Sequence, residues 1–176
     1  MSNSIDLIRF RIRDIPDFPK PGILFRDITP LWKDGPAFDA CMEIFSTRYS
    51  QKPDVIVGIE SRGFVIGSAF ASRHSIGFVP IRKKGKLPHH VESHEYDLEY
   101  GSDCVEIHKD AVHPGQKVLI MDDLLATGGT MLASIELLKR LGADVVGCAV
   151  VIDLPALGGR KKIEDAGYDV FSVIDY

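Results

Sequence analysis

Residues 118–130 read Val118-Leu-Ile-Met-Asp-Asp-Leu-Leu-Ala-Thr-Gly-Gly-Thr130, an apolar run that ends in two adjacent carboxylates and a glycine-rich turn. The run is continuous rather than alternating, which is typical of a strand buried on both faces of a parallel sheet. A helical pattern from Thr130 to Leu141 follows the turn. Strand, tight turn and helix are the repeating unit of an α/β fold, whose ligands bind beyond the carboxyl ends of the strands.

Apolar runs of the same kind recur on both sides of this stretch. Three of the ten prolines lie between Pro16 and Pro21, so residues 14–30 are expected to form a loop. The pattern predicts a single α/β domain over residues 1–176, in which helices flank a mostly parallel sheet. The expected strands are 54–59, 78–82, 117–121, 145–152 and 170–174, and the expected helices are 4–13, 34–49, 63–75 and 130–141.

One charged segment interrupts this alternation. Residues 82–86 carry four positive charges, and residues 92–103 contain five acidic side chains. A period-two pattern in the same region predicts a flexible loop with a two-stranded ribbon at its base. Three of the six histidines, His89, His90 and His94, lie in this segment, and their role stays open. The strands of the ribbon are expected at residues 94–100 and 104–109.

Composition excludes several classes of protein. The chain has 176 residues and a net charge of −4, without the basic footprint of a nucleic-acid binder. Uncharged stretches such as residues 63–72 are about half of what a membrane helix needs. Charged residues near the N-terminus also argue against a signal peptide. Cys41, Cys104 and Cys148 are odd in number and widely spaced, which favours reduced thiols in a cytoplasmic protein.

The turn after the tandem aspartates has the chemistry of an anion site. Glycines let backbone N–H groups converge, threonine hydroxyls add donors, and a helix N-terminus adds positive potential. The lysine of a nucleoside-triphosphate P-loop is missing, so the turn predicts a monophosphate site. Asp122 and Asp123 suit the two ring hydroxyls of a ribose and place negative charge beside its anomeric carbon. The predicted phosphate-binding residues are Ala126, Thr127, Gly128, Gly129 and Thr130.

Residues 118–130 resemble the phosphoribosyl pyrophosphate (PRPP) signature of the type I phosphoribosyltransferases. The resemblance covers nearly the whole chain, and several further segments are similar to the adenine branch of that family. These segments are Phe18-Pro-Lys-Pro-Gly22, Phe25-Arg-Asp-Ile-Thr-Pro30, Gly58-Ile-Glu-Ser-Arg-Gly-Phe64, Arg82-Lys-Lys-Gly-Lys-Leu-Pro88 and Leu98-Glu-Tyr-Gly101.

The resemblance implies the type I phosphoribosyltransferase fold and the conversion of adenine and PRPP to AMP and pyrophosphate. It also implies a homodimer, with Mg²⁺ bound mainly through PRPP or pyrophosphate and water, so no protein ligand to the metal is expected. Two alternatives stay open: transfer to another purine base, and a PRPP-sensing regulator that retains the fold. An acidic chain without a clear helix-turn-helix favours the enzyme over the regulator.

The resemblance also assigns roles around the phosphates and the ribose. Residues 126–130, the phosphate turn, hold the 5′-phosphate, and Asp122 and Asp123 hold the ribose hydroxyls. Residues 60–63 form the pyrophosphate loop, in which Arg62 binds pyrophosphate and a non-proline cis peptide is expected at Glu60–Ser61. The loop and ribbon of residues 82–109 form a hood that closes over the site.

The remaining roles concern the hood and the base. Arg82 and Lys86 of the hood are expected to meet pyrophosphate, and Glu99 to exchange a proton with the purine imidazole nitrogens. Tyr100 closes the pocket beside Glu99. Residues 1–33 are the base-recognition segment, in which Phe25 stacks on the purine and the backbone groups of Leu24 and Arg26 meet its edge.

Overall fold

The structure is a computed structural model that describes residues 2–49, 53–97 and 101–176. The chain divides into two compact units, Met1–Arg48 and Tyr49–Tyr176, and each unit is described by itself. Within the described ranges, no helix combines the length and the apolar character that crossing a membrane requires.

The described residues of the first unit form three helices and a two-stranded ribbon. Residues 14–30, expected to form a loop, instead contribute two antiparallel strands that pair Ile15 with Phe25, so that expectation is wrong. Each strand has only four residues, too few for a periodic pattern, and the prolines sit at the end of one strand and in the connection. The elements are α1 (Ser2–Phe10), β1 (Arg13–Pro16), β2 (Leu24–Asp27), α2 (Thr29–Lys33) and α3 (Gly35–Arg48).

Helix α3 follows the predicted pattern closely. Asp34 precedes it, and its carboxylate accepts a hydrogen bond from the backbone N–H of Ala37 at 3.1 Å. The helix buries Ala37, Cys41, Met42 and Phe45, which recur at helical spacing.

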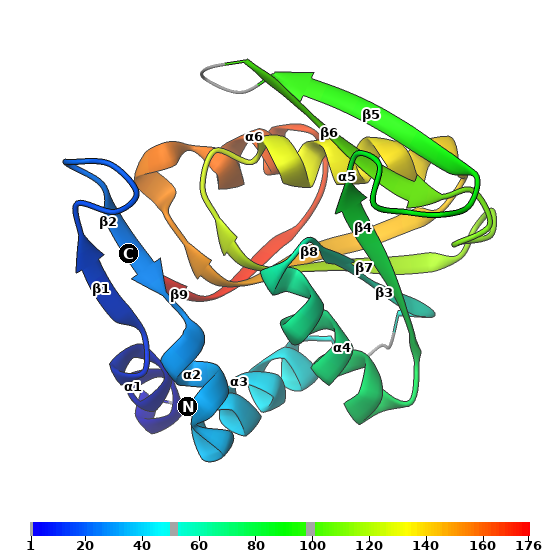
Figure 1. Cartoon of the computed structure of the whole chain (residues 1–176). Helices are drawn as coiled ribbons and strands as arrows, with labels where there is room; N and C mark the ends of the chain where they lie inside the picture. The colour runs from blue at the N-terminus through cyan, green and yellow to red at the C-terminus, as the bar shows by residue number, and fades with distance from the viewer. Residues whose placement is uncertain (1, 50–52, 98–100) are drawn as a thin grey trace. The chain divides into compact units, whose positions relative to one another are not determined.

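The second unit is built on a seven-stranded sheet with the order β5-β6-β4-β3-β7-β8-β9 (Figure 1). Five strands run parallel, and the hood strands β5 and β6 are antiparallel at one edge. The predicted mostly parallel sheet with a ribbon in the hood is confirmed. The strands are β3 (Val55–Ile59), β4 (Gly77–Lys83), β5 (Val91–Asp97), β6 (Ser102–His108), β7 (Lys117–Leu125), β8 (Asp144–Asp153) and β9 (Val170–Asp175).

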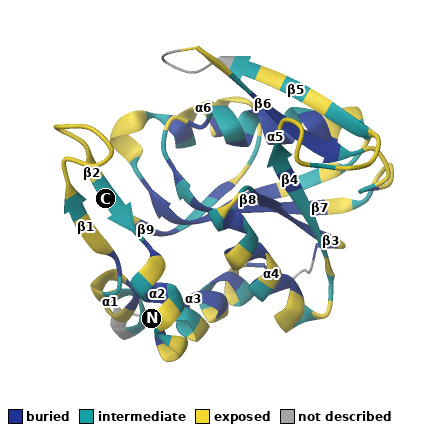
Figure 2. Cartoon of the chain, viewed as in Figure 1, coloured by how far each residue is buried: buried dark blue, intermediate teal, exposed yellow. Residues whose placement is uncertain are grey.

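Helices cover both faces of this sheet. Helix α4 (Arg62–His74) lies on one face, and α5 (Gly129–Arg140) and α6 (Gly159–Asp165) lie on the other (Figure 1). Every residue of β3 is buried (Figure 2), because Val57 joins the core cluster with α5 while Ile56 faces α4. The short turn η1 (Pro155–Leu157) and α6 were not expected, since seven largely charged residues carry no clear helical period.

Candidate active site

The two glycine-containing loops lie at the same edge of the sheet. Strands β3 and β7 are parallel neighbours, with Gly58 opposite Met121. Glu60 therefore follows β3 at the edge where Asp122 and Asp123 occupy β7. A Cβ on Gly63 would stand 2.7 Å from the carbonyl oxygen of Met121, so only glycine lets α4 begin this close to β7.

The tandem aspartates have different surroundings. Asp123 is buried, and its Oδ2 lies 3.1 Å from Nε of Arg62. Asp122 is half-buried, and its Oδ1 accepts a hydrogen bond from the backbone N–H of Asp123 at 2.9 Å. The structure thus brings Arg62 to the aspartates and joins the two loops through a charge pair.

Both aspartates have raised pKa values. Loss of water around the carboxyl raises the pKa of Asp122 well above its usual range, and the negative charge of Asp123 adds to this. Burial also raises the pKa of Asp123, although the guanidinium of Arg62 opposes it. A buried carboxyl group with a raised pKa ionises more readily when a partner with hydroxyl donors or positive charge binds beside it. The two aspartates therefore favour such partners.

The phosphate turn lines a cavity of about 110 Å³ that also includes Asp122. Gly128 has a φ of +82°, a conformation that favours glycine, and it immediately precedes α5. The turn thereby leads into the N-terminus of a twelve-residue helix, where backbone N–H groups are free of intrahelical partners. The cavity is small and matches an anion of phosphate size better than a whole nucleotide.

A second glycine turn supports the phosphate turn from behind. The N–H of Gly159 donates to the carbonyl oxygen of Ala126 at 3.0 Å, and a Cβ on Gly159 would stand 2.2 Å from that oxygen. Nε of Arg160, the next residue, donates a hydrogen bond to Oδ2 of the buried Asp153 at 2.6 Å. Its Nη1 donates to the carbonyl oxygen of Val170 at 2.8 Å. Sequence analysis missed these residues, although Gly158-Gly159-Arg160 repeats the pattern of strand, glycine turn and helix.

The expected cis peptide at Glu60–Ser61 is present. Glu60 accepts hydrogen bonds from Nζ of Lys86 at 2.5 Å, from Nη2 of Arg82 at 3.3 Å and from the backbone N–H of Lys83 at 2.9 Å. Burial raises the pKa of this carboxyl, but these hydrogen bonds outweigh it and lower the pKa to about 2. Arg82 and Lys86 therefore both contact Glu60, the first residue of the pyrophosphate loop. Sequence analysis assigned no role to this carboxylate.

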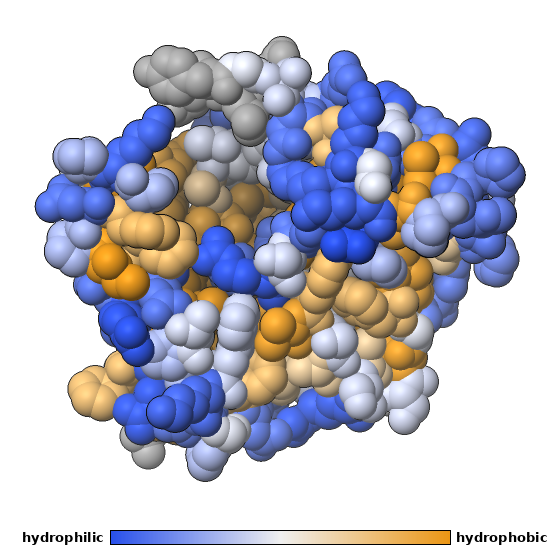
Figure 3. All heavy atoms as spheres, viewed as in Figure 1, coloured by the Kyte–Doolittle hydropathy of each residue, from blue (hydrophilic) through white to orange (hydrophobic). Residues whose placement is uncertain are grey.

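Hydrophilic side chains gather over the end of β4 and the turn that follows it (Figure 3). Lys83 forms an ion pair with Asp103, while Lys84 lies 3.7 Å from Glu95 at an exposed position. Glu99 and Tyr100, the expected proton-exchanging and pocket-closing residues, lie outside the described residues.

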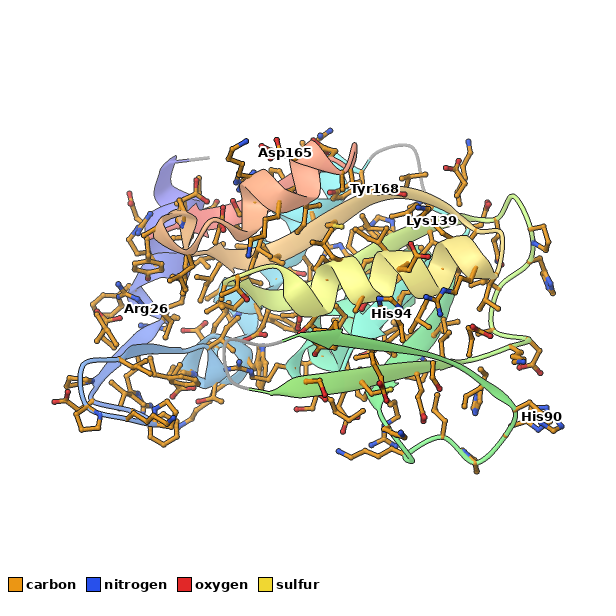
Figure 4. The ribbon with its side chains drawn as sticks, turned by 90° about the horizontal axis from the view of Figure 1, so that it is seen from above. Arg26, His90, His94, Lys139, Asp165 and Tyr168 are labelled. Atoms are coloured by element: carbon orange, nitrogen blue, oxygen red, sulfur yellow. The ribbon has the colours of Figure 1, made fainter. Side chains whose placement is uncertain are left out.

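The three histidines of the hood do not form one group. The rings of His89 and His90 are 4.8 Å apart, whereas His94 lies beside α5, where its Nδ1 is 2.8 Å from Nη2 of Arg140 (Figure 4). Within the described ranges, no three His, Cys, Asp or Glu side chains come together as a metal cage requires.

The expected base-recognition residues lie together on β2 of the first unit. Phe25 is half-buried and packs edge-on against Phe18, with ring centroids 5.1 Å apart. Arg26 forms an ion pair with Asp14 on the neighbouring strand. The ribbon thus presents an aromatic side chain flanked by the backbone groups of Leu24 and Arg26.

A larger hollow of about 730 Å³ also lies in the first unit, lined in part by Arg11, Arg13 and Lys33. Two of its cations already have carboxylate partners, because Arg11 pairs with Asp34 at 2.5 Å and Arg13 with Asp27 at 3.9 Å. The smaller cavity at the phosphate turn combines a helix N-terminus, glycines and the carboxylate of Asp122.

This fold and these two anion loops define a class of protein. A family model described as a phosphoribosyl transferase domain matches residues 33–175, so the chain belongs to the phosphoribosyltransferase family. The chain is 50% identical to the adenine phosphoribosyltransferase of Bordetella avium over 172 residues, which cover 97% of this chain and 94% of that protein. Within the family it belongs with the adenine phosphoribosyltransferases.

Solved structures agree with this assignment. The adenine phosphoribosyltransferase of Thermoanaerobacter pseudethanolicus matches with a TM-score of 0.93 and 50% identity, covering 98% of this chain and 99% of that chain. The Saccharomyces cerevisiae enzyme, complexed with adenine and an imino-altritol bisphosphate, matches with a TM-score of 0.94 and 36% identity, covering 99% and 100% of the two chains. The expected type I phosphoribosyltransferase fold is confirmed.

Proposed function

We propose that this chain transfers the 5-phosphoribosyl group from PRPP to adenine, giving AMP and pyrophosphate, as a step of purine salvage. The observation that carries the proposal is the placement of Asp122, Asp123 and the phosphate turn at one sheet edge with the pyrophosphate loop. The relatives reported above act on adenine by name, and the Saccharomyces cerevisiae structure holds adenine with a bisphosphate sugar analogue.

In this proposal the phosphate turn grips the 5′-phosphate through backbone N–H groups and threonine hydroxyls. Asp122 and Asp123 accept hydrogen bonds from the ribose hydroxyls. The bond between C1 of the ribose and the pyrophosphate oxygen breaks, and a bond from C1 to N9 of adenine forms. Positive charge develops on the ribose between these events, as in other glycosyl transfers, and nearby carboxylates stabilise it.

The leaving pyrophosphate carries concentrated negative charge, so its site must supply cations. Arg82 and Lys86 already converge on Glu60, and Arg62 opens α4 beside Asp123. We assign all three to pyrophosphate. Mg²⁺ bound through pyrophosphate oxygens and water would neutralise further charge on the leaving group. Closure of the hood would exclude water from the cationic ribose.

For the base, we assign stacking to Phe25 and edge recognition to the backbone groups of Leu24 and Arg26. A carbonyl that accepts from the 6-amino group of adenine would face an oxygen in hypoxanthine or guanine, which disfavours those bases. Glu99 takes the proton that N9 loses, and Tyr100 closes the pocket beside it. The proposal also includes a homodimer, on the strength of the family resemblance, and a cytoplasmic location, on the strength of the three reduced cysteines.

The test is pyrophosphate release from PRPP with adenine, hypoxanthine and guanine in turn, with and without Mg²⁺. We expect release with adenine and Mg²⁺, and at least a hundredfold lower kcat/KM with the other two bases. Lys86→Gln should lower kcat/KM about tenfold or more, whereas Lys84→Gln, at an exposed position of the same loop, should leave it within about twofold. Preferential use of another base, or no release with any base, would refute the assignment.

A further inference from the structure

The hood strand β5 lies along helix α5 (Figure 4), and hydrogen bonds join the two elements near both ends of that helix. In the last turn, Nη1 of Arg140 donates to the carbonyl oxygen of Ser93 at 3.1 Å. In the first turn, Oγ1 of Thr130 lies 2.9 Å from the hydroxyl oxygen of Tyr96. The hood and the phosphate turn therefore share a direct hydrogen bond between two hydroxyl groups.

The hydroxyl of Tyr96 has three polar neighbours. It accepts from Nζ of Lys83 at 3.2 Å, donates to Oδ2 of Asp103 at 3.2 Å, and lies closest to Oγ1 of Thr130, at 2.9 Å. A phenol has one proton to donate. Asp103 already accepts from the Lys83 side chain and from the backbone N–H of Cys104 at 2.8 Å. The carboxylate of Asp103 accepts the phenol proton, which leaves the phenol oxygen to accept from Thr130, so the 2.9 Å contact holds the Thr130 hydroxyl in place.

We propose that Tyr96 is a positioning residue of the sugar-phosphate site, which holds the Thr130 side chain through this contact between hydroxyls so that Thr130 faces the 5′-phosphate. Lys83 and Asp103 in turn hold the Tyr96 hydroxyl, because Lys83 donates to it and Asp103 accepts from it. Groups in a hydrogen-bonded network of this kind polarise one another, which strengthens each bond. This inference rests on the proposed function, because it takes the phosphate to lie in the turn of residues 126–130.

A double-mutant cycle with Tyr96→Phe and Thr130→Val tests the proposal. Tyr96→Phe should raise the KM for PRPP about three- to tenfold, the size of one hydrogen bond, and leave kcat within about twofold. In the Thr130→Val background, Tyr96→Phe should raise the KM no further, because the hydroxyl that Tyr96 positions is gone. The dissociation constant of ribose 5-phosphate, measured by calorimetry, should follow the same pattern, and thermal unfolding checks that each variant folds.

Arg140→Met is the matched control, because it releases the other end of the same strand without touching Thr130. It should leave the KM for PRPP within about twofold. An equal effect of Arg140→Met and Tyr96→Phe would show that Tyr96 only attaches the hood to α5. Equal effects of Tyr96→Phe in both backgrounds would overturn the positioning role. If Thr130→Val alone leaves the affinity for ribose 5-phosphate unchanged, the placement of the phosphate fails and the inference with it. Wild-type protein that binds ribose 5-phosphate but releases no pyrophosphate would refute only the proposed reaction.

Discussion

Nε of Arg62 lies 3.1 Å from Oδ2 of Asp123, and this charge pair joins the first residue of α4 to the end region of β7. Only 4% of the Asp123 side chain is exposed, so its charge depends on that partner. The pair keeps the pyrophosphate loop beside the ribose carboxylates. A substitution of either Arg62 or Asp123 should therefore affect the geometry of both loops.

Replacement of Asp123 by asparagine should lower kcat/KM by roughly a hundredfold or more, because it removes negative charge near the anomeric carbon and leaves Arg62 without its counter-charge. Steady-state kinetics with adenine and PRPP would measure the loss. Asp144→Asn, at the exposed start of β8, is the control and should leave kcat/KM within about twofold. Near-normal turnover of Asp123→Asn would reject the role of this carboxylate.

Asp122 should give a different signature, in which stability and activity move in opposite directions. Burial and the charge of Asp123 raise its pKa above the ordinary 3.8, so the folded protein binds this proton more tightly than the unfolded chain. Its contribution to the free energy of unfolding is then lost as the pH rises through the raised pKa. Asp122→Asn should unfold at a higher temperature than the wild type at pH 8 while losing turnover. A lower melting temperature at pH 8 would contradict this account.

The contribution of Glu60 to the free energy of unfolding has the opposite pH dependence. Its pKa falls from 4.5 to about 2, so its contribution to stability is complete above pH 4.5 and is lost as the pH falls toward 2. Compared with Glu60→Gln, the wild type should be more stable by up to about 3 kcal/mol at neutral pH. Urea unfolding between pH 7 and pH 3.5 should show this difference shrinking below pH 4.5, and a difference independent of pH would disprove the ion-pair origin.

Much of this arrangement was predictable from local sequence, and the failures have two causes. The buried strand before Asp122 and the turn at Gly128 each depend on a few neighbouring residues, whereas the cis bond after Glu60 was expected from the family resemblance. Contacts between distant segments depend instead on strand order. Tyr96 meets Thr130, and Gly159 meets Ala126, because sheet topology brings together residues more than thirty positions apart. The ribbon of β1 and β2 was missed because its two strands are too short for periodicity.

The contact of Gly159 with Ala126 gives a prediction of its own. Gly159→Ala would place a Cβ 2.2 Å from a backbone oxygen, so the phosphate turn must shift. The KM for PRPP should rise about tenfold or more, since a displaced turn no longer presents its N–H groups to the phosphate. Gly77→Ala, whose Cβ would meet Val55 at an ordinary 3.5 Å, should leave that KM unchanged. An unaltered KM in Gly159→Ala would show that the turn does not need this support.

Phe25 allows base recognition to be separated from phosphate recognition. Phe25→Ala removes the proposed stacking surface and should raise the KM for adenine about tenfold or more, while the KM for PRPP stays within about twofold. Phe10→Ala, an exposed phenylalanine at the end of α1, serves as the control. If the two Michaelis constants rise together in Phe25→Ala, the effect is structural and the stacking role is wrong.

The central claim is that the turn after the tandem aspartates holds the terminal phosphate of a sugar. A crystal structure of the protein with AMP tests it most directly. We expect the phosphate oxygens within hydrogen-bonding distance of the backbone N–H groups of residues 126–130, and the ribose hydroxyls beside Asp122 and Asp123. Nucleotide bound at any other place, with these residues untouched, would contradict the account.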